Sequence, residues 1–110
     1  MTLKEVCKNL GVTRRAVQGY EKAGLVSSVG KNKYGYLLYD EAAIAKIRSI
    51  KMYQDFGFTI NDIKVLMTVS DELYVRMMKE RIIAMKIELP MLERNIQIAE
   101  NCIREREKKY

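Results

Sequence analysis

The fold is decided by residues 2–24, which have the sequence TLKEVCKNLGVTRRAVQGYEKAG. Thr2 and Glu5 have the spacing of a capping box, in which each side chain bonds the backbone of the other at the start of a helix. We therefore predict a helix over residues 3–10, with its apolar side chains at helical spacing on one face. Gly11 follows as the left-handed residue that ends this helix.

A second helix is predicted two residues after that glycine. Thr13 is placed to cap it, residues 14–23 to form it and Gly24 to end it. Val17 and Tyr20 would face inward. Two short helices joined by a tight glycine turn are typical of a helix-turn-helix, whose second helix enters the major groove of DNA. The pattern therefore favours a DNA-binding protein.

Two short β-strands are predicted beyond the helix pair, at Leu25–Val26 and at residues 36–39. The glycines and the asparagine between them supply turn chemistry. The expected structure is a small two-stranded wing with residues 31–33, Lys-Asn-Lys, at its tip.

Two further helices complete a first domain, predicted as residues 1–68. Asp40 is placed to cap a helix over residues 41–56, and Thr59 to cap a short helix over residues 60–68. The side chains predicted to face inward from these helices are Ile44, Ile47, Ile50, Lys51 (by its stem), Phe56, Ile63, Leu66 and Met67.

The remaining residues, 69–110, are predicted to form a dimerisation arm. Apolar residues recur there at alternating spacings of three and four, an unbroken seam of about four heptads that is typical of a coiled coil. The alternative is a helix packed on its own domain, but the seam is longer than so small a domain could cover. The predicted dimer interface is Val75, Met78, Ile82, Met85, Leu89, Leu92, Ile96, Ala99 and Ile103.

Pro90 lies inside this predicted helix. A proline in a helix removes one backbone hydrogen bond and clashes with the carbonyl four residues earlier, at a cost of about 3 kcal/mol. The helix should therefore either kink near Pro90 or break there into a hairpin. The seam continues through Pro90 without a skip, which favours one kinked helix. Because the sequence ends soon after the heptads, no separate effector domain is expected.

The composition fits a folded, helix-rich protein with one basic end. Hydrophobic residues make up 48% of the 110 residues, and the net charge is +6. Residues 1–40 carry seven cations and three anions, a net of +4, whereas residues 70–110 carry nine cations and eight anions, a net of +1. Positive charge is thus concentrated where DNA binding is predicted, although a generic basic surface is the alternative.

The sequence indicates neither catalysis nor a bound cofactor. It has no His, no glycine-rich phosphate loop and no base placed beside Cys7 or Cys102, so we do not expect an enzyme. The two cysteines match no metal-binding spacing, so we expect no metal site. No signal peptide and no membrane-spanning apolar run is present, which predicts a cytoplasmic protein without a membrane partner.

Candidate contacts to double-stranded DNA lie on the second helix and the wing. Arg can pair with guanine and Gln with adenine in the major groove, and a phosphate contact is the alternative for each Arg. The wing would touch the DNA backbone or the minor groove, a solvated loop being the alternative. These candidates are Thr13, Arg14, Arg15, Gln18, Lys31, Asn32, Lys33 and Tyr34.

Aromatic and methionine residues gather in the sequence around the start of the arm. Such surfaces can accept varied apolar ligands, so a small-molecule effector is one interpretation. Ordinary core packing is the other interpretation, and it is favoured. The residues are Met52, Tyr53, Phe56, Met67, Tyr74, Met77 and Met78.

Several short motifs occur together in the first 64 residues. They are Gly11-Val12-Thr13, residues 20–25 (YEKAGL), Gly35-Tyr36 with Tyr39, Asp40-Glu41, residues 56–59 (FGFT) and Asp62-Ile63-Lys64. As a set, over about residues 2–68, they resemble the MerR family of bacterial transcription regulators. The long helix that follows is also where that family places one.

This resemblance implies a winged helix-turn-helix homodimer joined by an antiparallel coiled coil. Family members bind a pseudopalindrome in a promoter and distort the DNA so that RNA polymerase can use it, commonly after an effector binds. The resemblance also adds Tyr20 and Tyr36 to the candidate DNA contacts of this chain.

The sequence departs from the family pattern at two places. Residues 18–20 are Gln-Gly-Tyr where the family has Arg-Tyr-Tyr, and Leu37 replaces an Arg in the wing. These departures support one alternative, a protein-interaction module whose helix-turn-helix has lost DNA binding. The other alternative is an architectural, excisionase-like protein that bends DNA, but the long arm argues against it.

Overall fold

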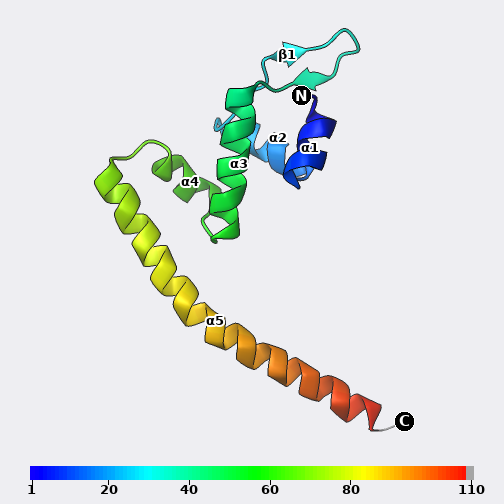
Figure 1. Cartoon of the computed structure of the whole chain (residues 1–110), viewed down its shortest axis with the longest axis vertical. Coiled ribbons are helices and arrows are strands. Elements are labelled where there is room, and N and C mark those ends of the chain that lie inside the picture. The colour runs from blue at the N-terminus through cyan, green and yellow to red at the C-terminus, as the bar shows by residue number, and fades with distance from the viewer. Residues whose placement is uncertain (109–110) are drawn as a thin grey trace. The chain divides into compact units, whose positions relative to one another are not determined.

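The computed structural model describes residues 1–108 and divides the chain into two compact units, Met1–Val69 and Ser70–Tyr110. Figure 1 traces the chain and labels its helices and the first strand. The last two residues of the predicted arm, Lys109 and Tyr110, lie outside the described residues. The fold is mostly helical with a small two-stranded wing and a long C-terminal helix, as predicted.

The first unit begins with the predicted helix pair, α1 (Leu3–Leu10) and α2 (Arg14–Lys22). The capping box at the start of α1 is confirmed, with both reciprocal hydrogen bonds present. Gly11 has φ of 64°, the left-handed conformation that ends α1 and turns the chain into α2. Thr13 caps α2 by accepting a hydrogen bond from the Ala16 N–H at 3.0 Å.

The wing consists of β1 (Gly30–Lys31) and β2 (Leu37–Leu38), paired antiparallel with Gly30 opposite Leu38 and Lys31 opposite Leu37. The predicted first strand at Leu25–Val26 is therefore wrong. These two residues instead cover the end of α2, where the Leu25 N–H donates to the Tyr20 carbonyl and Val26 is buried. Their apolar character reflects core packing and not strand pairing.

The N-terminal residues join the wing at the outer edge of β2. The Thr2 backbone forms a bridge with Leu38, and Met1 and Tyr39 exchange two hydrogen bonds, of 2.7 Å and 2.9 Å. In Figure 1 the N-terminus accordingly lies beside the wing and next to α1. Because Thr2 directly precedes α1, this bridge holds the wing next to the helix pair.

Two helices, α3 (Glu41–Asp55) and α4 (Ile60–Leu66), complete the first unit. Their predicted caps are confirmed, since Asp40 accepts from the Ala43 N–H and Thr59 accepts from the Asp62 N–H. The helix α4 ends before the predicted Thr68. Met67 is therefore its C-terminal cap and is exposed, which corrects the prediction that Met67 faces inward.

The core of the first unit draws on all of its helices and on the wing. α1 contributes Leu3 and Val6, and α2 contributes Val17 and Tyr20. The other buried members are Val12, Val26, Tyr39, Ala43, Ile47, Ile50 and Ile63. Because both short helices of the pair bury one face here, the opposite face of α2 is left exposed.

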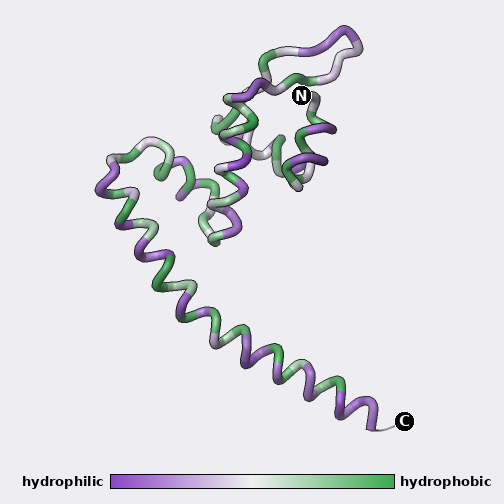
Figure 2. Tube along the Cα trace, in the orientation of Figure 1, coloured by the Kyte–Doolittle hydropathy of each residue, from purple (hydrophilic) through white to green (hydrophobic). Residues whose placement is uncertain are grey.

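The second unit is one helix, α5 (Asp71–Glu107), capped by Ser70, and it continues through Pro90. The prediction of a single helix is thereby confirmed, and the alternative hairpin is excluded. Figure 1 shows that its axis changes direction near the middle, in the yellow-to-orange part where Pro90 lies. Figure 2 shows hydrophobic and hydrophilic residues alternating from turn to turn along its length. None of its residues, all of which the structure describes, is buried.

Candidate nucleic-acid interface

The exposed face of α2 carries most of the predicted major-groove contacts. Arg14, Arg15 and Gln18 are all exposed, whereas Val17 and Tyr20 of the same helix are buried. The two arginines are the first residues of the helix, directly after the cap Thr13. Arginine and glutamine side chains at the leading end of an exposed helix can reach base edges and phosphates in a major groove.

Tyr20 does not belong to this exposed face. Its side chain is only 2% exposed, and its hydroxyl donates to the Gln54 Oε1 atom of α3 at 2.5 Å. A side chain so deeply packed would have to leave the core to reach DNA. We therefore infer that Tyr20 holds α2 against α3, and we leave it out of the candidate DNA contacts.

Two buried tyrosines fix the orientation of α2. Tyr20 ties α2 to α3, and Tyr39, at the end of β2, donates to the Glu21 carboxylate at 2.6 Å. Buried tyrosine hydroxyls usually have a hydrogen-bond partner, so one bond at each hydroxyl is generally expected. The particular partners Gln54 and Glu21 are 34 and 18 residues away, and the sequence carried no signal that could identify them.

The Tyr39 bond predicts a loss of stability at alkaline pH. Burial, together with the hydrogen bond to Glu21, raises the pKa of Tyr39 well above its ordinary value of 10.0. The folded protein therefore holds this proton more tightly than the unfolded chain, and the stabilisation present below about pH 10 is lost as the pH rises further. We expect the free energy of unfolding to fall more steeply above about pH 10 in the unmodified chain than in Tyr39→Phe.

Urea unfolding across this pH range, followed by circular dichroism, measures the difference. Lysine titration affects both proteins alike, so the gap between the two pH profiles reports on Tyr39. Parallel profiles would show that the Tyr39 hydroxyl has the same pKa in the folded and unfolded chains.

The wing turn is organised by Asn32. Its side-chain oxygen accepts hydrogen bonds from the Tyr34 and Tyr36 backbone N–H groups at 2.9 Å and 3.1 Å. Its backbone N–H also donates to the Tyr36 carbonyl. Asn32 was predicted as a DNA contact, but its oxygen is already engaged, and only its amide NH₂ remains for a ligand.

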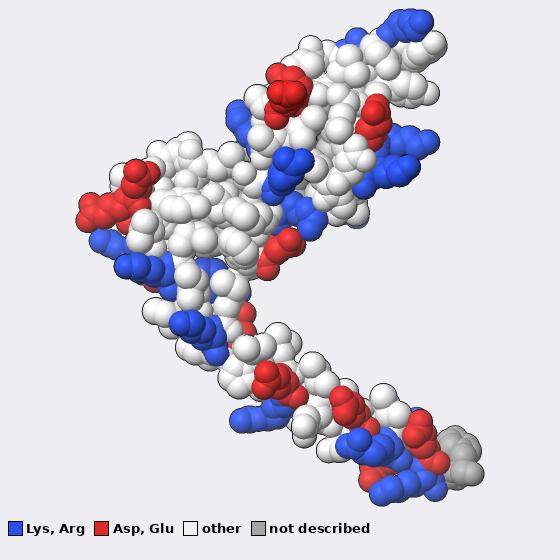
Figure 3. All heavy atoms as spheres, in the orientation of Figure 1, with Lys and Arg blue, Asp and Glu red and all other residues white. Residues whose placement is uncertain are grey.

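Cations and aromatic rings share the outer part of the wing. The Lys33 Nζ atom lies 5.1 Å from the centre of the Tyr34 ring, and the Tyr34 and Tyr36 rings are 6.4 Å apart. Both tyrosines are largely exposed, at 69% and 63%. Figure 3 shows basic side chains at the outer end of the wing, where Lys31 and Lys33 lie. Such a surface suits contact with a phosphate backbone.

Gly19 lies on the exposed face of α2, one turn after Arg15, in the middle of the helix. A Cβ atom built at Gly19 meets no atom within 4 Å, and its backbone is helical. Gly19→Ala should therefore stabilise the first unit by about 0.5–1 kcal/mol, because alanine loses less conformational entropy in a helix. The matched control is Gly24→Ala, which also meets no atom but has φ of 78° and should destabilise.

Urea midpoints of the two variants and the unmodified chain measure this pair of opposite shifts. Destabilisation by Gly19→Ala would contradict the helical conformation assigned to that position.

The seam on α5 is an uncovered apolar stripe. Seven of its nine predicted residues are exposed, and Met78 and Met85 are half-buried. Large apolar side chains such as Leu89, Leu92 and Ile96 each keep more than half of their surface exposed. A continuous exposed apolar stripe at heptad spacing is typical of a helix that pairs with another.

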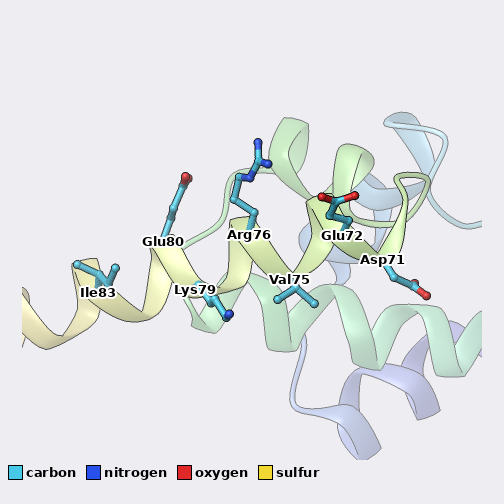
Figure 4. A pocket seen from close by; sticks show the side chains of 7 residues that line it. All are labelled: Asp71, Glu72, Val75, Arg76, Lys79, Glu80 and Ile83. Atoms are coloured by element: carbon cyan, nitrogen blue, oxygen red, sulfur yellow. The ribbon is translucent and has the colours of Figure 1, made fainter.

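A shallow groove runs along the first turns of α5, and all of its lining residues belong to that helix. Figure 4 shows Glu72, Arg76 and Glu80 along one side and Val75, Lys79 and Ile83 along the other. It is an open furrow between two rows of side chains on one helix, not an enclosed ligand cavity.

The described residues do not assemble a metal site or a membrane span. Within residues 1–108, no three His, Cys, Asp or Glu side chains form a group that could hold a metal ion. Among the helices of this part of the chain, none has the length and apolar content needed to cross a bilayer. Of the predicted aromatic group, Tyr53 contacts Phe56 and also Phe58 edge-to-face within the first unit.

Comparison with known protein families shows which family the first unit matches. The family described as "MerR HTH family regulatory protein" matches residues 1–69. The mercuric resistance operon regulatory protein of Bacillus cereus is 31% identical over 67 residues, which are 61% of this chain and 51% of that protein. An uncharacterised HTH-type transcriptional regulator of Synechocystis is 32% identical over 63 residues, 57% of this chain and 46% of that protein. The chain spans about half the length of these curated relatives.

Solved structures share the fold over most of the chain. The N-terminal part of MtaN, the Bacillus subtilis multidrug transporter activator, aligns with a TM-score of 0.65 and 21% identity, over 88% of this chain and 94% of that one. HiNmlR, a MerR family regulator lacking the sensor domain and bound to promoter DNA, aligns with a TM-score of 0.70 and 17% identity, over 88% and 78% of the two chains.

Proposed function

We propose that this chain, which belongs to the MerR family of helix-turn-helix regulatory proteins, is a DNA-binding transcriptional regulator that acts as a homodimer. The observation that carries the proposal is the exposed face of α2, where Arg14, Arg15 and Gln18 stand together at the leading end of the helix. The basic wing supplies a second contact surface within the same unit. Residues 1–68 would bind DNA, and residues 69–110 would join two chains.

In this proposal α2 enters the major groove. Arg14 and Arg15 would pair with guanine or hold phosphates, and Gln18 would pair with adenine. Thr13 would donate to a phosphate in addition to capping the helix. The wing residues Lys31, Lys33, Tyr34 and Tyr36, with the amide NH₂ of Asn32, would contact the adjacent backbone or minor groove.

The seam on α5 would join two such units into a symmetric dimer. A two-fold dimer binds a site whose halves are related by the same symmetry, so the proposed target is a pseudopalindrome in a promoter. Regulation would follow from distortion of that DNA to suit RNA polymerase. The relative HiNmlR, which was solved on promoter DNA, supports the choice of target.

Binding to the DNA upstream of the chain's own gene, measured at about 50 mM and about 200 mM salt, tests this function. We expect tight binding to this fragment, and a loss of affinity of roughly a thousandfold between the two salt concentrations, because phosphate contacts release counterions. Weak binding that is insensitive to salt would support a protein-interaction module. Tight binding without preference over unrelated DNA would support an architectural protein.

A further inference from the structure

One side-chain hydrogen bond joins α2 to the base of the wing. The Tyr39 hydroxyl, directly after β2, donates to the Glu21 carboxylate in the last turn of α2 at 2.6 Å. Tyr39 is buried and Glu21 is half-buried, so the bond lies at the edge of the core. A hydrogen bond to an ionised carboxylate is shorter and stronger than one between neutral groups. Within residues 1–108, it is the only hydrogen bond between α2 and residues 30–39.

The backbone of the wing is attached to a different helix. The Thr2–Leu38 bridge and the two Met1–Tyr39 hydrogen bonds join β2 to the residues that lead into α1. They hold the wing beside α1 and do not involve α2. The direct polar link between the wing and α2 is therefore the Tyr39–Glu21 bond.

Glu21 occupies an unfavourable position for a carboxylate. It is the only acidic residue of α2 and lies in the last turn, where the partial negative charge of the helix C-terminus disfavours an anion. On a helix proposed to lie against DNA, it would also be repelled by phosphates. Its bond to Tyr39 offsets both effects, which indicates that the position of this carboxylate serves a purpose other than the stability of α2 alone.

We propose that Glu21 and Tyr39 are positioning residues for DNA binding, and that their hydrogen bond holds the wing in a fixed position relative to α2. This inference rests on the DNA binding of the proposed function. Neither side chain would touch DNA. Instead, α2 and the wing would meet the DNA as one surface, so that binding by the wing would not require the ordering of a separately moving loop.

The wing is short enough to transmit this constraint to its cations. Lys31 pairs with Leu37, which lies only two residues before Tyr39. Asn32 organises the turn by accepting two backbone hydrogen bonds, and Lys33 follows it directly. A shift at Tyr39 would therefore be carried to both lysines instead of being absorbed in a flexible segment.

A double-mutant cycle between this bond and the wing lysines tests the proposal. In the unmodified chain, Lys31→Ala with Lys33→Ala should weaken promoter binding on the order of a hundredfold at about 50 mM salt, because both wings of the dimer lose phosphate contacts. In the Tyr39→Phe background the same change should cost less than about tenfold, because a wing that is not held in place contributes less to binding. A role in folding alone lowers the active fraction equally in both backgrounds, so an equal cost would overturn the proposal.

Glu21 offers a matched pair of variants that changes the bond without a difference in charge. Glu21→Gln and Glu21→Ala both remove the carboxylate, but only glutamine keeps an oxygen that can accept from the Tyr39 hydroxyl. We expect removal of the wing lysines to have its full cost in the glutamine variant and the reduced cost in the alanine variant. Equal costs in these two backgrounds would contradict a role for the hydrogen bond. Should Tyr39→Phe fail to fold, this pair carries the test alone.

Tyr20→Phe is the control for a general loosening of α2. It removes the other buried tyrosine hydroxyl that holds this helix, together with its bond to Gln54, but leaves the Tyr39–Glu21 bond in place. Removal of the wing lysines should therefore keep its full cost in this background. A reduced cost would show that any loss of support for α2 has the same effect, and Tyr39 would have no special role.

Fluorescence anisotropy with a labelled fragment from upstream of the chain's own gene measures all of these variants, after circular dichroism has shown that each is folded. The result separates the inference from the proposed function. If the unmodified chain does not prefer this fragment to unrelated DNA, the proposed function fails. If it does, but the lysines contribute equally in every background, only the positioning role of Glu21 and Tyr39 fails.

Discussion

A chain carrying Ile82→Glu and Ile96→Glu is expected to be monomeric at micromolar concentration and to lose promoter binding. In a symmetric dimer the two changes would place four carboxylates in the seam, where the neighbouring seam residues are apolar and water is excluded. Burying unpaired charge costs several kcal/mol, so association should weaken by more than about a thousandfold, which corresponds to about 4 kcal/mol. A monomer reaches only one half of a two-fold site, so DNA affinity should fall by at least about a hundredfold.

The matched control for this variant is Ile83→Glu with Ile98→Glu. These isoleucines are exposed to a similar degree, at 59% and 53%, and lie on α5 outside the seam. The control should sediment as a dimer and bind DNA normally. Dissociation of the control with survival of the seam variant would place the dimer contact on the other face of α5.

The second large effect is expected on DNA binding from Arg14→Ala with Arg15→Ala. Both side chains are exposed and neither belongs to the hydrophobic core, so the fold should be unaffected. A dimer would lose four cationic contacts, and each is worth roughly 1 kcal/mol or more, so affinity should fall by at least about a hundredfold. Where the arginines hold phosphates, the dependence of affinity on salt should also become shallower.

The control for this experiment is Arg94→Ala with Arg104→Ala, which removes the same formal charge from α5 outside its seam. Fluorescence anisotropy with a labelled promoter fragment measures both variants at two salt concentrations. The account predicts a loss only in the α2 variant. An equal loss in both would indicate that binding depends on net charge alone and not on the exposed face of α2.

Local sequence signals predicted the helices because their ends are encoded within a few residues. The Thr2–Glu5 capping box and the caps at Thr13 and Asp40 satisfy backbone groups directly beside them, so no distant contact is needed to place them. The heptad seam was equally plain, because nine apolar positions in one register specify a long helix even through Pro90.

Features that depend on distant contacts were not predicted. The first wing strand was misplaced because Leu25–Val26 are apolar for the sake of the core, whereas the true strand, Gly30–Lys31, has no strand propensity of its own. Family resemblance suggested Tyr20 as a DNA contact, but its hydroxyl is bonded to Gln54 on another helix. The exposed arginines of α2 were found from sequence because they are charged and directly follow the Thr13 cap, at the leading end of the second helix.

The most direct test of a dimeric, sequence-specific regulator is a nuclease footprint on the DNA upstream of the chain's own gene, combined with the mass of the protein–DNA complex. The account predicts one protected pseudopalindrome, with two symmetric halves, occupied by two chains. Protection spread evenly over the fragment, or a single chain bound at an asymmetric site, would contradict it.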